Sequence, residues 1–315
     1  MIKISSINPS LTTQYKKDVF PRVKEFLTNT GDPMYAPVLQ YLNTNGQLDD
    51  QKVETLLTGE LPDLLDAIKK IGTIKTEGKN EGFHRLYKNF TNRILGKAWG
   101  EKIGVKICPY CNRSYIFTLK NGGTRPQYDH FFPKSLYPYL ALSMYNLIPC
   151  CPVCNSIKTD FDPFDPKTKK ENFIYPYRDY YGTQISFSVV ANGTFGPWLG
   201  CSDDFEIKLT TDQTINPELY FKAQNTVKQL KLEELYNKHK DYVQDIIRTT
   251  YIYDENYCST LFTSFPELFS SVQDVENLVF MNYLDEKNWD KRVLAKLSHD
   301  IKDEILNGPY HSLIL

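Results

Sequence analysis

The chain has 315 residues, of which 41% are hydrophobic and 24% charged, and its 37 basic and 38 acidic side chains leave a formal net charge of −1. This composition excludes a long disordered or fibrous protein, and the length is enough for two or three domains with a buried core. No run approaches the roughly 20 apolar residues of a membrane-spanning helix, and the first residues lack the pattern of a signal peptide. We therefore expect a cytoplasmic protein.

The first hundred residues are expected to be helical. Between residues 39 and 68, apolar side chains recur near helical spacing, and Gly, Asn and Pro interrupt the pattern. Residues 83–99 predict an amphipathic helix whose outer side carries Arg85, Lys88 and Arg93.

A local excess of positive charge overlaps this helical region. Residues 66–106 contain ten Lys or Arg and four acidic residues, a net charge of +6, although the whole chain is nearly neutral. A basic stretch of this kind attracts the phosphates of nucleic acid, or it is only a solvated helix face. We expect Arg85, Lys88 and Arg93 to contact nucleic acid.

Five of the seven cysteines lie between residues 108 and 154, which in a reducing compartment indicates metal ligation rather than disulfides. Cys108 and Cys111, like Cys151 and Cys154, are two residues apart, the spacing that presents two thiolates to one tetrahedral zinc ion. Cys150 is an alternative to Cys151, but its three-residue spacing to Cys154 breaks the symmetry of the pairs. The four cysteines predict a structural zinc site, and a zinc module without catalysis is the simpler alternative.

The 39 residues between the cysteine pairs are too many for an ordinary four-cysteine zinc ribbon. They predict a strand from residue 113, a turn at Asn121-Gly122, and a second strand that ends near Asp129-His130. The sequence therefore predicts a folded insert between the two zinc-binding turns.

After the cysteines, residues 183–191 and 205–210 predict two strands separated by turn formers. From about residue 217 the apolar spacing becomes helical, and a last helix is expected around residues 287–307.

Motif residues follow one another in a fixed order along residues 129–158. They are Asp129-His130, Asn146-Leu147, Cys151-x-x-Cys154 and Asn155-x-x-Lys158. In this order, and behind the first cysteine pair, they resemble the HNH family, a zinc-stapled ββα-metal nuclease fold. The resemblance covers about 50 residues, and although each element alone is a weak signal, their joint occurrence in order is specific.

This resemblance implies catalytic roles for four residues. Hydrolysis of a phosphodiester needs an activated water and neutralised phosphate charge, and His130 suits the general base because its ordinary pKa is about 6.5. Asp129 and Asn155 offer oxygen ligands for a catalytic Mg²⁺ or Mn²⁺. Asn146 is expected to brace the loop that follows His130, and Lys158 either meets a phosphate or is solvated.

The sequence as a whole predicts an α+β protein in four segments. Residues 1–100 and 214–315 are the helical regions, residues 101–175 the HNH core with its zinc site, and residues 176–213 a small β insertion. More widely, the chain resembles HNH nucleases of bacterial anti-phage systems of the Septu type, which accompany an ATPase. That likeness implies a DNA-cleaving endonuclease with an ATPase partner; the alternatives are cleavage of RNA, such as tRNA, and a zinc-stabilised nucleic-acid-binding or adaptor protein without catalysis.

Overall fold

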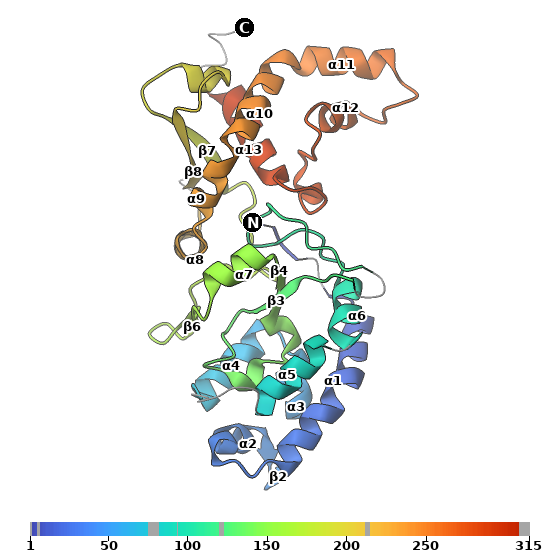
Figure 1. The fold of residues 1–315 in the computed structure, drawn as a ribbon, viewed down its shortest axis with the longest axis vertical. Coiled ribbons are helices and arrows are strands. Elements are labelled where there is room, and N and C mark those ends of the chain that lie inside the picture. Colours follow the sequence, from blue (N-terminus) through green and yellow to red (C-terminus); the bar gives the residue numbers. More distant parts are fainter. Residues whose placement is uncertain are drawn as a thin grey trace. The chain divides into compact units, whose positions relative to one another are not determined.

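The structure is a computed structural model, and it describes residues 2–4, 7–74, 82–92, 94–119, 123–211 and 215–308. The fold is mixed α+β, and the strands of this described part form two-stranded antiparallel sheets (Figure 1). Contacts divide the chain into two compact units. We call residues 3–108 and 116–178 the N-terminal unit, and residues 1–2, 109–115 and 179–315 the C-terminal unit.

The first helix, α1 (Pro9–Asn29), shows how the local sequence sets the structure of the N-terminal unit. Asn8 precedes it and its side-chain oxygen accepts a hydrogen bond from the backbone N–H of Ser10 at 2.9 Å. The buried side chains of α1 recur every four residues, so they form one stripe that packs against neighbouring helices. The expected helices of the first hundred residues are present. The others are α2 (Ala36–Leu42), α3 (Asp50–Thr58), α4 (Leu61–Ile71), α5 (Gly82–Asn92) and α6 (Ile94–Ile103).

Two strands and a helix follow one another in the second half of this unit. They are β3 (Gln127–His130), β4 (Leu147–Cys150) and α7 (Pro152–Lys158). The strands are antiparallel, with His130 opposite Leu147, and α7 packs against β3 (Figure 1). The chain between the strands contains two short 3₁₀ helices, η3 (Pro138–Leu140) and η4 (Met144–Asn146).

Of the hairpin predicted upstream of Asp129, the second strand is present as β3, but the described residues contain no first strand paired with it. Residues 116–119 form no strand, and the turn expected at Asn121-Gly122 lies outside the described residues. The strand that carries Asp129 pairs instead with β4, the strand that leads into the second cysteine pair. The remaining short strands of this unit are β1 (Asn43–Thr44), β2 (Gln47–Leu48), β5 (Phe164–Asp165) and β6 (Lys170–Glu171).

The C-terminal unit contains the two strands that the sequence predicts after the cysteines. β7 (Ile185–Ala191) and β8 (Phe205–Thr211) are antiparallel over their whole length, with Ile185 opposite Thr211. In β7, buried and partly exposed residues alternate over most of the strand. This alternation is the pattern by which the sequence predicts the strand. The helices that follow are α8 (Pro217–Gln229), α9 (Leu232–Tyr236), α10 (Lys240–Ile252), α11 (Glu255–Ser264) and α12 (Val272–Val279).

The last helix, α13 (Ala295–Asn307), covers the edge of β7 and begins eight residues later than the sequence suggests. Asp300 accepts a hydrogen bond from the backbone N–H of Phe187 at 2.9 Å, and Glu304 accepts one from that of Val189 at 2.8 Å. These carboxylates satisfy backbone donors that an open sheet edge would leave exposed. Within the described part of the chain, no helix combines the length and apolar character needed to cross a bilayer.

Candidate active site and metal centre

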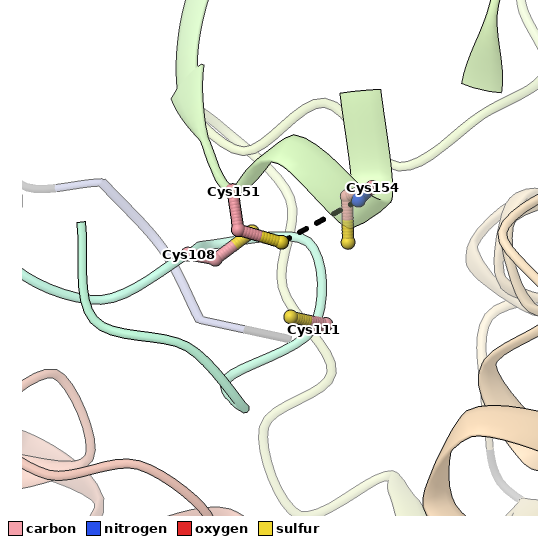
Figure 2. Close-up of side chains that lie close together, drawn as sticks. All are labelled: Cys108, Cys111, Cys151 and Cys154. Atoms are coloured by element: carbon pink, nitrogen blue, oxygen red, sulfur yellow. Dashed lines mark hydrogen bonds between the residues drawn. The ribbon is translucent and has the colours of Figure 1, made fainter. Parts of the chain in front are cut away.

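Four cysteines come together as the spacing of the two pairs predicts. The Sγ atoms of Cys108, Cys111, Cys151 and Cys154 all lie within 4.8 Å of one another, and all four residues are buried (Figure 2). Tetrahedral zinc with Zn–S bonds of about 2.3 Å requires sulfur atoms about 3.8 Å apart. The four cysteines therefore fit a zinc ion.

Backbone N–H groups donate hydrogen bonds to two of these sulfur atoms. The Sγ of Cys111 accepts a hydrogen bond from the backbone N–H of Arg113 at 3.4 Å, and that of Cys151 accepts one from Cys154 at 3.4 Å. Cys151 is also the N-cap of α7, whose first residue is Pro152, so the start of the helix fixes the turn that carries the second pair. Amide donors of this kind stabilise negative charge on sulfur.

Cys150 stands apart from the cluster. It ends β4 and is buried opposite Gln127, while the neighbouring Cys151 contributes the fourth sulfur atom. Cys151 and not Cys150 therefore belongs to the group of four, as the symmetric spacing predicts, because successive residues of an extended strand point to opposite sides.

A pocket of about 460 Å³ opens beside β3 and α7 in the N-terminal unit. It brings together residues from α5, β3 and α7 that are far apart in the sequence. Among those that line it are Tyr87, Arg125, Asp129, His130, Lys134 and Asn155. Three of the four residues that the sequence nominates for catalysis thus share one pocket.

The side chain of His130 is buried, and its imidazole ring is neutral. Its side chain is 6% exposed, and Nε2 lies 3.0 Å from the carbonyl oxygen of Ala141. A carbonyl only accepts, so Nε2 carries the proton and Nδ1 keeps its lone pair. Among the described residues, Nδ1 has no hydrogen-bond partner. Burial, aided by the charge of Lys134, holds the pKa of His130 well below its usual value, so the ring is neutral at pH 7.

Asp129 lines the same pocket but already has a cationic partner. The Nζ atom of Lys158 lies 3.1 Å from its carboxylate, and this amine also donates to the carbonyl oxygens of His130 at 2.9 Å and Phe131 at 3.2 Å. The side chain of Lys158 is fully buried. The expectation that Lys158 meets a phosphate or is solvated is therefore corrected: in this structure it is an internal cation that ties α7 to β3.

Asn146 has the hydrogen bonds expected of a loop brace. Its Oδ1 accepts from the backbone N–H of Phe132 at 2.8 Å, and its Nδ2 donates to the carbonyl oxygens of Phe132 at 3.1 Å and Leu140 at 3.0 Å. The side chain is completely buried. Asn146 therefore fixes the backbone that follows His130 and does not line the pocket.

Asn155 is half-buried on the first turns of α7 and lines the pocket. Its Nδ2 donates to the side-chain oxygen of Gln127 at 2.7 Å. The amide oxygen of Asn155 takes no part in this hydrogen bond. Asp129 and Asn155 thus provide a carboxylate and an amide oxygen at one pocket, the ligand types that Mg²⁺ and Mn²⁺ take in proteins.

Two of the basic residues predicted to contact nucleic acid, Arg85 and Lys88, do not line this pocket. Arg85 and Lys88 are exposed on α5, and Arg93 lies outside the described residues. Two other cations line the pocket, Arg125 just before β3 and Lys134 just after it. The sequence signal that could have found them is their position on either side of the Asp129-His130 motif.

Comparisons with known proteins leave the site to be interpreted from its own geometry. No family model, no curated protein and no solved structure matches this chain.

Proposed function

We propose that the chain is a metal-dependent nuclease of the HNH type, which hydrolyses phosphodiester bonds in the pocket beside β3. The observation that carries the proposal is the state of His130: a neutral imidazole whose Nε2 donates to Ala141, whose Nδ1 has no hydrogen-bond partner among the described residues, and which lines a pocket with room for a phosphodiester. A histidine that served only the core would have its second nitrogen satisfied or packed away from solvent.

The order of elements supports the same proposal. The motif residues follow one another on β3, at the junction of η4 and β4, and on α7, in the order that the resemblance implies. Two of the four clustered cysteines, Cys151 and Cys154, lie at the start of α7. A closed four-sulfur site suits a structural zinc, whereas the pocket has oxygen and nitrogen groups that a reaction can use.

In this proposal Asp129 and Asn155 hold the catalytic Mg²⁺ or Mn²⁺. When bound there, the cation would neutralise phosphate charge and stabilise the departing 3′-oxygen. The ammonium of Lys158 lies 3.1 Å from the Asp129 carboxylate and fixes its position, but it also weakens the negative charge on that carboxylate. We therefore expect weak metal binding that tightens when the substrate phosphate supplies further negative charge.

The chain's own residues then account for the proton transfer. Nδ1 of His130 takes a proton from the attacking water, and the resulting imidazolium still donates from Nε2 to Ala141. Asn146 keeps the loop of Phe132 and Leu140 in place, so the ring does not move as its charge changes. Such a base contributes about 10²–10⁴-fold to the rate.

The test is a cleavage assay on DNA and on RNA of the same sequence, with Mg²⁺, with Mn²⁺ and with no added cation. We expect cleavage that depends on the added cation, with DNA the better substrate and with products that end in a 3′-hydroxyl. Metal-independent cleavage, or no cleavage of either polymer by zinc-loaded protein with any cation, contradicts the proposal.

The proposal includes a partner ATPase and a role in anti-phage defence, supported by the wider resemblance of the sequence alone. Co-purification of the chain with a chain bearing an ATP-binding motif from the same host tests this part separately from the nuclease assay.

A further inference from the structure

Two cations line the pocket without an acidic partner. Arg125 and Lys134 are half-buried at its wall, and among the described residues neither forms an ion pair. The buried lysines of the described residues do have carboxylates: Lys158 has Asp129, Lys222 has Glu218 at 2.7 Å, and Lys296 has Asp300 at 2.9 Å. A cation kept half-buried and without a carboxylate at a pocket is suited to an anionic ligand.

Both cations are held by tyrosine rings. The guanidinium of Arg125 lies 5.4 Å from the ring centre of Tyr128, and its Nη1 donates to the carbonyl oxygen of Pro126 at 2.9 Å. The Nζ atom of Lys134 lies 5.9 Å from the ring centre of Tyr87. These contacts orient each positive group at little cost, since they leave its other N–H groups available to a ligand.

The rings themselves are fixed in the N-terminal unit. The hydroxyl of Tyr128 donates to the carbonyl oxygen of Gly96, and that of Tyr87 donates to the carbonyl oxygen of Tyr128 at 3.3 Å. The ring of Tyr87 also packs edge-on against that of His130, with 4.4 Å between centres. Tyr87 therefore contacts both Lys134 and the proposed base His130, and it is hydrogen-bonded to Tyr128, whose ring lies against Arg125.

The backbone of Lys134 has an anchor of its own. Nε2 of His84 on α5 lies 3.0 Å from the carbonyl oxygen of Lys134, so that nitrogen donates to it. Pro133 accepts backbone hydrogen bonds from Leu136 at 3.0 Å and Tyr137 at 2.9 Å, which closes the loop into a turn. The loop is therefore ordered before any ligand arrives.

The charges of the pocket favour an anion. The charged side chains of its lining are Arg125 and Lys134 with Asp129 and Asp160, and the carboxylate of Asp129 is compensated by the buried Lys158. The net charge of these five groups is positive by one, and the two cations without carboxylates are the half-buried ones.

We infer that Arg125 and Lys134 bind phosphates of the polynucleotide strand and so position the scissile phosphodiester at His130. This inference deepens the proposed nuclease function and rests on it. Because the contacts are to phosphate, they serve DNA and RNA alike and carry no base preference. Arg125 suits a bidentate phosphate contact, and Lys134 acts as a point charge.

The experiment measures binding separately from cleavage. Arg125→Gln and Lys134→Gln are made in the His130→Ala background, and the affinity for one fluorescein-labelled oligonucleotide, as DNA and as RNA, is followed against salt with no divalent cation added. Each substitution should weaken binding to both polymers about tenfold and lower the slope of log affinity against log salt by about 0.7–0.9.

Controls separate the inference from a loss of fold. Lys228→Gln, in the exposed last turn of α8, should leave affinity and slope unchanged. Arg125→Lys and Lys134→Arg should keep most of the slope, and all variants should keep their zinc. An unchanged slope in both Gln variants overturns the inference, as does a loss confined to RNA, which would indicate contact with the 2′-hydroxyl. Cleavage by the His130→Ala parent would instead overturn the proposed function while leaving this binding result to be judged alone.

Discussion

The cysteine cluster and the His130 pocket both take residues from the segment between β3 and α7, yet the two sites differ in how their side chains are satisfied. In the cluster every ligand is a buried thiol within 4.8 Å of the others, so a zinc ion would complete its coordination with protein atoms alone. The pocket has about 460 Å³ of space, one carboxylate already compensated by a lysine, and a histidine nitrogen without a partner among the described residues.

Because of this difference, we expect the cysteine cluster to stabilise the fold and the His130 pocket to carry the proposed reaction. A closed site lowers the free energy of the folded state and has no position left for a substrate, whereas an open site keeps groups unsatisfied that a reaction can use. Lys158 and Asn146 lie beside the pocket, but both are fully buried and satisfied by hydrogen bonds. We therefore expect these two residues, like the cysteines of the closed site, to stabilise the fold.

Loss of a cluster cysteine should have the largest effect. Cys154→Ser should remove the zinc and lower the free energy of unfolding on the order of 5 kcal/mol, because structural zinc binding is coupled to folding. Metal analysis and thermal unfolding check this. Cys150→Ala is the matched control: it lies outside the cluster and should keep the zinc. Zinc loss in the control but not in Cys154→Ser would contradict the ligand set.

Removal of the buried cation should come next. Lys158→Met leaves the carboxylate of Asp129 buried without its partner, which costs about 3–5 kcal/mol of unfolding free energy. Lys134→Met, at the pocket wall, should cost less than about 1 kcal/mol. Denaturant unfolding compares the two variants. Equal stability of both would show that Lys158 is not the internal cation described above.

The loop brace should have a smaller effect on stability. Asn146→Ala leaves the backbone groups of Phe132 and Leu140 without their side-chain partner and should cost about 2–3 kcal/mol. Asn155→Ala, whose side chain is half-buried, should cost under about 1 kcal/mol. Hydrogen exchange should detect faster exchange of the Phe132 amide in the first variant alone, and unchanged exchange would count against the brace.

The basic stretch should give the smallest effect. Joint replacement of Arg85, Lys88 and Arg93 by Gln should lower the salt dependence of nucleic-acid binding, by about 0.7–0.9 for each phosphate that is no longer bound, with no change of thermal stability. Titration of the triple variant against salt measures this. If affinity and slope both match the wild type, the outer face of α5 is a solvated or partner-facing surface.

The features best predicted from the sequence are those fixed by neighbouring residues. The two-residue spacing of the cysteine pairs and the alternation in 183–191 are local, and the structure has both the cluster and β7. The pairing of β3 with β4 is not readable from the sequence, because β4 becomes adjacent only after the intervening chain folds through two 3₁₀ helices. The turn-forming residues Asn121-Gly122 give no indication that β3 pairs with a strand farther along the chain.

Side-chain roles escape sequence-based prediction for the same reason. Lys158 reaches Asp129 across 29 positions, so its burial depends on how α7 packs against β3 and not on its place in the motif. Arg125 and Lys134 flank the Asp129-His130 motif in the sequence, but the sequence does not show that both side chains line the same pocket. The motif nominates His130 as the proposed base, whereas the burial that keeps its ring neutral is visible only in the structure.

The central claim is that His130 acts as the base of a metal-dependent reaction, and a single-turnover rate tests it most directly. Zinc-loaded wild type, His130→Ala and the control His299→Ala, on α13, are compared on one DNA substrate with Mg²⁺. We predict that His130→Ala slows cleavage about 10²–10⁴-fold while zinc content and substrate binding stay at the wild-type level, and that His299→Ala changes the rate far less. A rate for His130→Ala equal to that of the wild type would contradict the claim.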